Sequence, residues 1–365
     1  MKNKFNRLSL ALAIVSLIPA VSLAEPFIAK EKIYTLSNGI QNEIYVYEHS
    51  GNGVIQAAGN YATGGAGTAA SLANQGALAL SENQRYLFAI NAGSNELSVF
   101  SVDGDVPVLL DHVAEQGVTP VSVTVSGNLV YVVNSGDDSI FGYRFDPLSG
   151  KLHALKDSYY KLNSTGSGAA EISFNKGGDA LVVTAKATNK IISITLNEHG
   201  LPANRHLTNS NGVTPYGFAF GKHDQFFVTE AQGGAANATT VSSYKLSEDG
   251  AVTLIDGSVA DGQTAACWLA TTPNGRLAFA SDAHSNAISA YAVSRKGELS
   301  LLESLAAAEN VPLDLAVSKD GTVLYSLNAG DQSISTFSID ETTGALQNLQ
   351  NVYSVPATAT GLVVK

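Results

Sequence analysis

A short pattern of large apolar residues recurs along the chain: an aliphatic residue followed three positions later by an aromatic one. It occurs at Ile44/Tyr47, Leu97/Phe100, Ile140/Tyr143, Val241/Tyr244, Ile288/Tyr291 and Ile334/Phe337, and Ile191/Ile194 fills the remaining place with a second aliphatic residue. The copies, taken in chain order, are 53, 43, 51, 50, 47 and 46 residues apart. Seven copies at this spacing predict a four-stranded unit repeated around an axis.

The pattern also predicts how each strand is packed. Residues three positions apart on a β-strand point to opposite faces of its sheet. A strand with large apolar groups on both faces must be covered on both sides. Blades that stack radially provide such cover, whereas a sheet with one wet face does not.

Other strand and turn signals hold constant places in each unit. A turn that begins with asparagine lies six residues before most of the signature aliphatics, as at Asn38, Asn91, Asn134 and Asn328. A β-rich stretch precedes this turn. A shorter strand of small residues comes earlier still, joined by hairpin turns such as Pro273-Asn274-Gly275. A glycine turn and a fourth, outer strand follow the signature strand.

The two ends of the chain predict how the ring closes. The first unit lacks an innermost strand, because residues 32–36 have the pattern of a second strand. Residues 361–364 at the C-terminus supply a strand without a unit. We therefore expect an all-β fold, a seven-bladed β-propeller with four-stranded antiparallel blades, in which the C-terminal strand completes the N-terminal blade. This arrangement would also remove an exposed sheet edge.

The first 24 residues have the pattern of an export signal. Lys2, Lys4 and Arg7 precede an apolar stretch over residues 8–21, and small residues in Ser22-Leu23-Ala24 offer a cleavage site. The alternative is an uncleaved membrane anchor. Cleavage would leave residues 25–365 as a single propeller domain, secreted or periplasmic. Because the chain has one cysteine, no disulfide can form within one molecule.

Charge narrows the range of partners. The whole chain has a formal net charge of −11, and removal of the signal takes away three basic and no acidic residues, which leaves −14. Electrostatic attraction does not favour the binding of an acidic chain to nucleic acid or to an anionic membrane surface. We expect a monomer without nucleic acid or membrane contacts after cleavage, and a small-molecule ligand or a protein partner.

Several segments resemble one known family, the secreted lactonase-like propellers, which are related to 6-phosphogluconolactonase and 3-carboxymuconate cyclase. They are Gly76-Ala77-Leu78-Ala79-Leu80-Ser81, Asn91-Ala92-Gly93-Ser94-Asn95, Thr119-Pro120-Val121-Ser122-Val123, Lys186-Ala187-Thr188-Asn189, Thr214-Pro215-Tyr216-Gly217-Phe218-Ala219-Phe220, Glu230-Ala231-Gln232-Gly233-Gly234 and Gln263-Thr264-Ala265-Ala266-Cys267-Trp268. The resemblance covers the mature chain and implies a lactone hydrolase or muconate-type cyclase acting at the central funnel.

The sequence departs from this family at two places. The resemblance implies Pro-Xaa-His at the start of one inner strand and Pro-Arg-His in the next blade, where this chain has Pro120-Val121-Ser122 and Ala169-Ala170-Glu171. A proton-transfer group and an anion-holding cation are thereby replaced. A non-catalytic propeller that binds a small ligand or a protein therefore remains the alternative.

Loops that enter the innermost strands share one end of a propeller with the loops between second and third strands. Candidate catalytic residues there are Glu171 and Lys186, which belong to one blade and are expected to face each other, either as base and charge partner or as a plain ion pair. Glu230 is a third candidate and precedes a glycine-rich segment, residues 233–237, with the composition of a flap.

A larger group from the same loops is predicted to bind the ligand, and it consists of Gln75, Asn91, Asn134, Tyr216, Gln263, Trp268, Asp314 and Asn328. For the asparagines the alternative is a structural turn, because asparagine tolerates the left-handed conformation and bonds its own backbone. For Trp268 the alternative is a filler between blades.

Metal and cofactor chemistry have no sequence signal. The seven histidines lack paired metal-ligand spacing, and Cys267 has no neighbouring cation in sequence to lower its pKa. EF-hand loops, phosphate-binding glycine loops and nucleophile elbows are missing from the sequence. We therefore expect no cofactor and no metal, and a ligand that is a lactone or resembles a carbohydrate.

Overall fold

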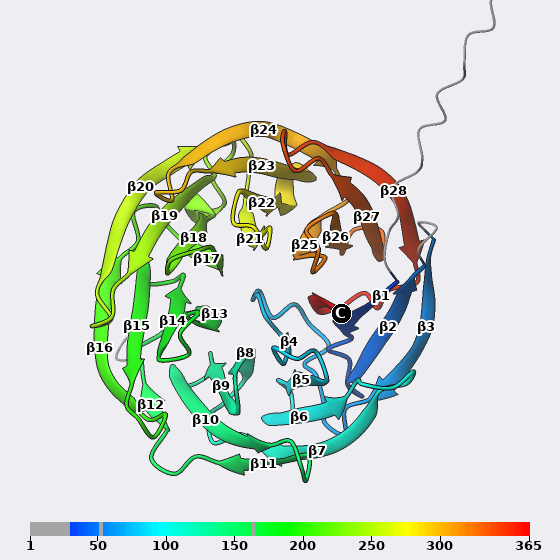
Figure 1. Cartoon of the computed structure of the whole chain (residues 1–365), viewed down its shortest axis with the longest axis vertical. Helices are drawn as coiled ribbons and strands as arrows, with labels where there is room; N and C mark the ends of the chain where they lie inside the picture. Colours follow the sequence, from blue (N-terminus) through cyan, green and yellow to red (C-terminus); the bar gives the residue numbers. More distant parts are fainter. Residues whose placement is uncertain (1–29, 51–53, 163–164) are drawn as a thin grey trace, which may run out of the picture.

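A computed structural model describes residues 30–50, 54–162 and 165–365. The predicted export signal, residues 1–24, lies outside the described residues. Seven antiparallel sheets surround a central axis (Figure 1). No helix in this part of the chain is long and apolar enough to cross a bilayer.

Each blade has four main strands that run from the axis to the rim. In that order, blade 1 consists of β29 (Thr360–Val364), β1 (Glu31–Leu36), β2 (Glu43–His49) and β3 (Ile55–Ala62), and blade 2 consists of β4 (Leu78–Leu80), β5 (Tyr86–Asn91), β6 (Glu96–Ser101) and β7 (Val108–Ala114). Blade 3 consists of β8 (Pro120–Ser126), β9 (Leu129–Asn134), β10 (Ser139–Asp146) and β11 (Lys151–Ala154), with β12 (Tyr160–Lys161) also paired to β10, and blade 4 consists of β13 (Ala169–Phe174), β14 (Ala180–Ala185), β15 (Lys190–Leu196) and β16 (Pro202–Asn209). Blade 5 consists of β17 (Pro215–Phe220), β18 (Gln225–Glu230), β19 (Thr240–Leu246) and β20 (Val252–Ala260), blade 6 of β21 (Ala266–Thr271), β22 (Leu277–Asp282), β23 (Ala287–Val293) and β24 (Leu299–Ala308), and blade 7 of β25 (Pro312–Val317), β26 (Val323–Asn328), β27 (Ser333–Ile339) and β28 (Leu346–Tyr353). Two 3-10 turns, η1 (Gln232–Gly234) and η2 (Ala283–Ser285), follow β18 and β22.

All seven signature pairs lie on the third strand of a blade, as the pattern predicted. Six of the pairs divide between two core clusters, one on each side of the strand. On β23, for example, Ile288 packs in the cluster shared with blade 7 and Tyr291 in the cluster shared with blade 5. Cover on both faces is therefore confirmed.

Two tyrosines of the signature have a second role that their spacing did not predict. In blades 3 and 6 the hydroxyl reaches a carboxylate at the junction with the preceding blade: Tyr143 donates to Glu115 at 2.8 Å and Tyr291 donates to Asp261 at 2.7 Å. A tyrosine can thus fill the space between blades and also satisfy a buried acid.

The predicted closure of the ring is confirmed. Strand β29 pairs antiparallel with β1, with Leu362 opposite Thr35 and Val364 opposite Ile33. Residues Lys32 and Lys365 exchange two backbone hydrogen bonds of 2.8 Å at the end of the ladder. In Figure 1 the red C-terminal strand lies beside the blue β1 on the inner side of blade 1.

Candidate functional site at the mouth of the central channel

The mouth is the end of the ring where chain segments enter the inner strands and where second strands turn into third strands. The prediction that these two sets of loops share one end is confirmed by the antiparallel order of each blade. Several inner strands begin with a register shift, for example between Ala169 and Glu171 on β13 and between Pro120 and Ser122 on β8. Such bulges re-aim the side chains that follow them.

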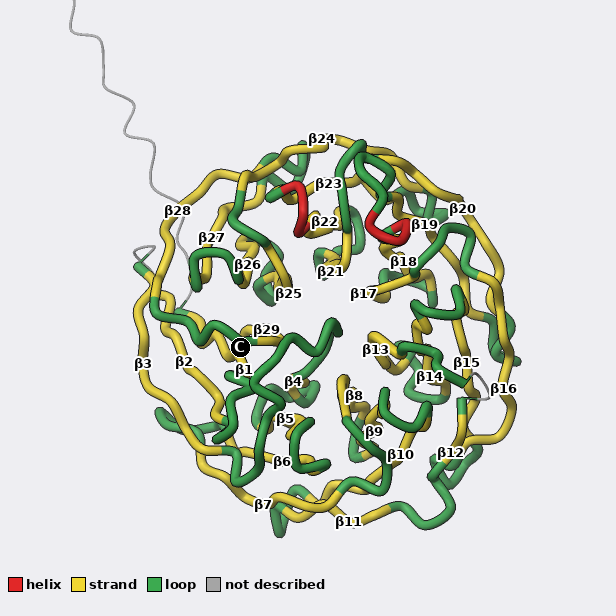
Figure 2. Tube along the Cα trace, turned by 180° about the vertical axis from the view of Figure 1, so that it is seen from behind, coloured by secondary structure: helices red, strands yellow, loops and turns green. Residues whose placement is uncertain are grey.

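One segment, residues 73–76, fills the centre of the ring, and we call it the plug. It ends the connection between β3 and β4, which Figure 2 shows running inward to the axis. The plug leads into blade 2 and forms hydrogen bonds with each of the other six blades. Its partners are Thr360 in blade 1 (to Asn74), Val121 (to Asn74) and Val123 (to Gly76) in blade 3, Ala170 (to Gln75) and Lys186 (to Ala73) in blade 4, Phe218 in blade 5 (to Gln75), Trp268 (to Asn74) and Leu269 (to Gln75) in blade 6, and Asp314 in blade 7 (to Gly76).

The side chain of Gln75 was expected to face a ligand, and that expectation is wrong for this structure. Its amide nitrogen donates to the carbonyl of Leu269 at 2.9 Å and to that of Phe218 at 3.3 Å. Its amide oxygen accepts the Leu269 N–H at 3.0 Å. Backbone groups of β17 and β21 therefore occupy the whole amide.

Lys186 lies at the outer side of the plug, half-buried. Its ammonium donates to the carbonyl of Ala73 and lies 4.7 Å from the centre of the Tyr216 ring. Burial lowers the pKa of Lys186 to about 8, and the nearby Cys267 opposes this shift. Burial also raises the pKa of Cys267 to about 12, so its thiol stays protonated at neutral pH.

Apolar groups surround this lysine. Tyr216 and Trp268 are buried with ring centres 5.4 Å apart, and Ala73, Cys267 and Leu313 pack against them while keeping some exposure. Because the Trp268 indole is buried and donates to the carbonyl of Asn74 at 2.7 Å, it packs beneath the mouth and offers no open ring face. We call Ala73, Lys186, Tyr216, Cys267 and Leu313 the mouth patch.

The expected pairing of Glu171 with Lys186 is wrong. No carboxylate in the described parts of the chain lies within 4.0 Å of the Lys186 ammonium. Glu171 follows the bulge of β13 and points under the plug, where it accepts the Phe218 N–H at 2.6 Å. Burial, assisted by the charge of Asp314, raises the pKa of Glu171 well above its usual value.

Asp314 is likewise buried beneath the plug instead of facing the mouth. Its carboxylate accepts the Gly361 N–H at 3.0 Å and a backbone hydrogen bond from Gly76. Burial raises its pKa to about 7.

Three predicted ligand-binding asparagines are fully buried between blades, and none of them has the left-handed conformation of the turn alternative. Asn328 donates to Glu309 at 2.6 Å, Asn134 donates to Glu115 at 3.2 Å and Asn91 donates to Ser98 at 2.7 Å. Each ends a second strand that is buried on both faces, and its side chain turns toward the blade junction.

Glu230 takes the equivalent place on β18 and is also completely buried. Its carboxylate accepts hydrogen bonds from the Gly212 N–H at 2.7 Å and from the Thr240 hydroxyl at 2.6 Å. Gln263 points away from the channel and donates to the carbonyl of Ser304 on β24 at 2.7 Å. The predicted flap bonds to the next blade through the Asn237 N–H, which lies 2.9 Å from the Thr264 hydroxyl.

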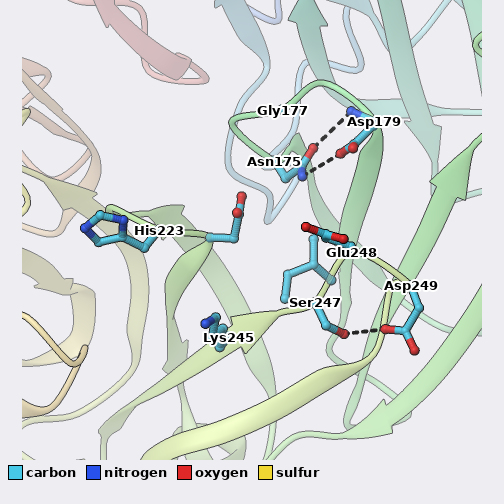
Figure 3. A pocket seen from close by; sticks show the side chains of 10 residues that line it. Asn175, Gly177, Asp179, His223, Lys245, Ser247, Glu248 and Asp249 are labelled. Atoms are coloured by element: carbon cyan, nitrogen blue, oxygen red, sulfur yellow. Dashed lines mark hydrogen bonds between the residues drawn. The ribbon is translucent and has the colours of Figure 1, made fainter.

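A cavity of about 790 Å³ lies at the other end of the ring, between blades 4 and 5. Figure 3 shows Asn175, Asp179, His223, Lys245 and Glu248 around it. Lys245 lies near the end of β19, and the others belong to turns between first and second or third and fourth strands, which antiparallel order places opposite the mouth. Among the described residues, no three His, Cys, Asp or Glu side chains are grouped to hold a metal ion.

Comparisons with known proteins agree with the fold. A family model described as a lactonase, 7-bladed beta-propeller, matches residues 26–166 and 237–363. No protein of curated function matches the sequence. A solved structure from Lactobacillus plantarum is 17% identical, with a TM-score of 0.75 over 92% of this chain and 99% of that one.

Two further similar structures are of proteins named for a function. A protein from Bacteroides uniformis, provisionally assigned as a 6-phosphogluconolactonase, is 16% identical, with a TM-score of 0.73 over 91% of this chain and 98% of that one. A periplasmic gluconolactonase from Pseudomonas aeruginosa is 14% identical, with a TM-score of 0.70 over 92% of this chain and 99% of that one. At such identities the likeness shows the fold alone.

Proposed function

The chain belongs to the lactonase family of seven-bladed β-propellers, and from that membership we propose that it opens lactone rings at the mouth patch. One observation carries the proposal: Lys186 presents a half-buried ammonium at the mouth, and no carboxylate of the described residues neutralises it. A positive charge held in a poorly hydrated place is suited to an oxygen that becomes negative during a reaction.

The reaction would proceed by addition of hydroxide or water to the lactone carbonyl. The Lys186 ammonium would donate a hydrogen bond to the carbonyl oxygen and stabilise the negative charge that develops there. The ring C–O bond then breaks, the ring oxygen takes up a proton, and a hydroxy acid is released. In this scheme Glu171 is not the base, because it points under the plug and not toward Lys186, and burial raises its pKa.

The composition of the mouth patch favours a lactone with an apolar body over a phosphorylated sugar lactone. Lys186 is the single cation of the patch, and Ala73 and Leu313 offer mainly apolar surface. A phosphate group is bound best by several charged donors in a fixed arrangement, such as those of an arginine guanidinium. At the family's arginine and histidine positions this chain has Ala170, Glu171 and Ser122.

The predicted export signal agrees with this substrate class, since sugar phosphates belong to the cytosol. We propose that the mature protein works in the periplasm or the medium. One structural neighbour is a periplasmic gluconolactonase, which supports the periplasm as the location.

Ligand binding without turnover is a second candidate function. It is favoured by the position of both central carboxyls, Glu171 and Asp314, which lie under the plug and therefore place no base beside Lys186. Binding would use the same ammonium and the same apolar groups.

Lys186→Met is expected to lower kcat/KM for alkyl-substituted γ- and δ-lactones by on the order of 100-fold, the usual loss when one oxyanion donor is removed. Ring opening is followed in a pH-stat, with glucono-δ-lactone in the same panel. Lys190→Met is the matched control, because Lys190 lies in the same blade and bonds to Asn209 instead of the plug. Its kcat/KM should match that of the parent.

The other results separate the two candidates. Turnover that persists in Lys186→Met would refute the proposed site. If no lactone is opened, lactones that raise the melting temperature of the parent but not of Lys186→Met would support binding without turnover. Neither turnover nor a shift in melting temperature would overturn both candidates.

A further inference from the structure

Two buried carboxyl groups flank the plug from opposite sides of the ring. Glu171 on β13 is 6% exposed and Asp314 on β25 is 3% exposed. A Cβ built on Gly76 would lie 3.9 Å from the Cγ of Glu171, and Asp314 accepts a hydrogen bond from the Gly76 backbone. Gly76 therefore lies between the two acids.

No described cation neutralises either carboxyl group. The other titratable side chains around the plug are Lys186, Tyr216 and Cys267. Lys186 donates to the carbonyl of Ala73 at the outer end of the plug and forms no ion pair with the acids. Like charges in a buried site oppose each other, so the two groups cannot easily ionise together.

The hydrogen bonds indicate which acid ionises first. Asp314 accepts N–H groups from Gly361 and Gly76, whereas Glu171 accepts the N–H of Phe218. Since N–H donors stabilise a carboxylate, Asp314 should lose its proton first and Glu171 should keep the proton that remains. This order agrees with a pKa of about 7 for Asp314 and a pKa well above its usual value for Glu171.

We propose that the plug is a proton-controlled gate, which stays in the channel while Glu171 and Asp314 share at least one proton and leaves it when both carry charge. Two carboxylates buried on either side of Gly76 call for hydration, and water would reach them when residues 74–76 move. Both pKa values are raised in the closed state, so closure is favoured at low pH and is lost as the pH rises through them.

Opening the gate would also act on the mouth patch. The Lys186 ammonium is held by the carbonyl of Ala73, and this contact breaks if the plug withdraws. This consequence for ligand binding rests on the proposed function. The movement itself does not, and it can be tested without any ligand.

The chain contains a natural reporter, because Trp268 is its one tryptophan and donates to the carbonyl of Asn74 in the plug. Between pH 6 and pH 9 we expect Trp268 emission to shift to the red and acrylamide quenching to rise severalfold, while the far-ultraviolet circular dichroism stays constant. Hydrogen exchange of residues 70–78, corrected for its intrinsic pH dependence, should accelerate over the same range.

Glu171→Gln mimics the protonated acid and is expected to keep quenching low and exchange slow up to pH 9. Glu248→Gln, at the opposite end of the ring, should behave like the parent. Lys186→Met should retain the transition, which would show that titration of the lysine does not cause it. A parent without a transition, or the same transition in Glu171→Gln, would overturn the gate, whatever the outcome of the lactone assay.

Discussion

Removal of residues 357–365 is expected to leave a protein that aggregates or melts on the order of 10 °C lower than the parent. The deletion takes away β29, so β1 becomes an exposed edge with unpaired backbone groups. Leu362 is buried and Val363 and Val364 are partly buried, and such side chains contribute roughly 1.5–3 kcal/mol each when fully buried, which is an upper bound. In a domain of this length, each kcal/mol of lost stability lowers the melting temperature by a few degrees at most.

Calorimetry or thermal circular dichroism measures this effect. Leu362→Asp should reproduce much of the loss, because it places a charge in the closing strand. Tyr353→Ser is the control, since Tyr353 is 57% exposed on an outer strand. A truncated protein that melts at the temperature of the parent would show that ring closure does not depend on β29.

Gln75→Ala is expected to lower the free energy of unfolding by about 3–6 kcal/mol. The substitution leaves the Phe218 carbonyl and both backbone groups of Leu269 without their partner in the plug. Each buried polar group that loses its partner costs about 1–3 kcal/mol, less where water enters the gap. Denaturant unfolding, followed by far-ultraviolet circular dichroism, gives the difference.

Two variants sharpen this measurement. Gln75→Glu keeps the size of the side chain but removes both donors, so it should destabilise to a similar extent. Gln56→Ala removes an exposed glutamine from the outer strand β3 and should leave stability within about 0.5 kcal/mol of the parent. Equal stability of Gln75→Ala and Gln56→Ala would mean that the plug does not hold the blades together.

The repeated part of the fold could be predicted from sequence because its physical cause is local. Burial on both faces of a third strand favours an aliphatic and an aromatic residue three positions apart, as in Ile288/Tyr291. Six of the seven third strands have this pair, and the seventh has two aliphatic residues, Ile191 and Ile194. Closure by residues 361–364 followed from the same count of strands, since one blade lacked a member and one strand lacked a blade.

The plug could not be predicted in this way, because it occurs once and has no repeat to reveal it. One signal was present: the longest interval between signature copies, 53 residues, separates Ile44 from Leu97 and contains the extra segment. Its contacts, such as those of Gln75 with β17 and β21, join residues more than 140 positions apart. Sequence spacing carries no information on such pairs.

Side-chain direction explains the errors at the site. Glu171 and Lys186 do belong to one blade, but the bulge on β13 directs Glu171 under the plug while Lys186 stays at the mouth. Asn134 and Asn328 end strands at the mouth, yet their side chains turn into the blade junctions, where Glu115 and Glu309 accept their hydrogen bonds. Three of the candidates do come together, because Tyr216 lies against both Lys186 and Trp268.

The most direct test of the account is the pH dependence of kcat/KM for an alkyl lactone between pH 6 and pH 10. If hydroxide attacks a carbonyl held by the Lys186 ammonium, kcat/KM rises with pH and levels off near pH 8, where the lysine loses its proton. The residual rate of Lys186→Met should rise across the whole range without a bend. A parent profile without a bend near pH 8, or the same bend in Lys186→Met, would contradict the assignment of the chemistry to this lysine.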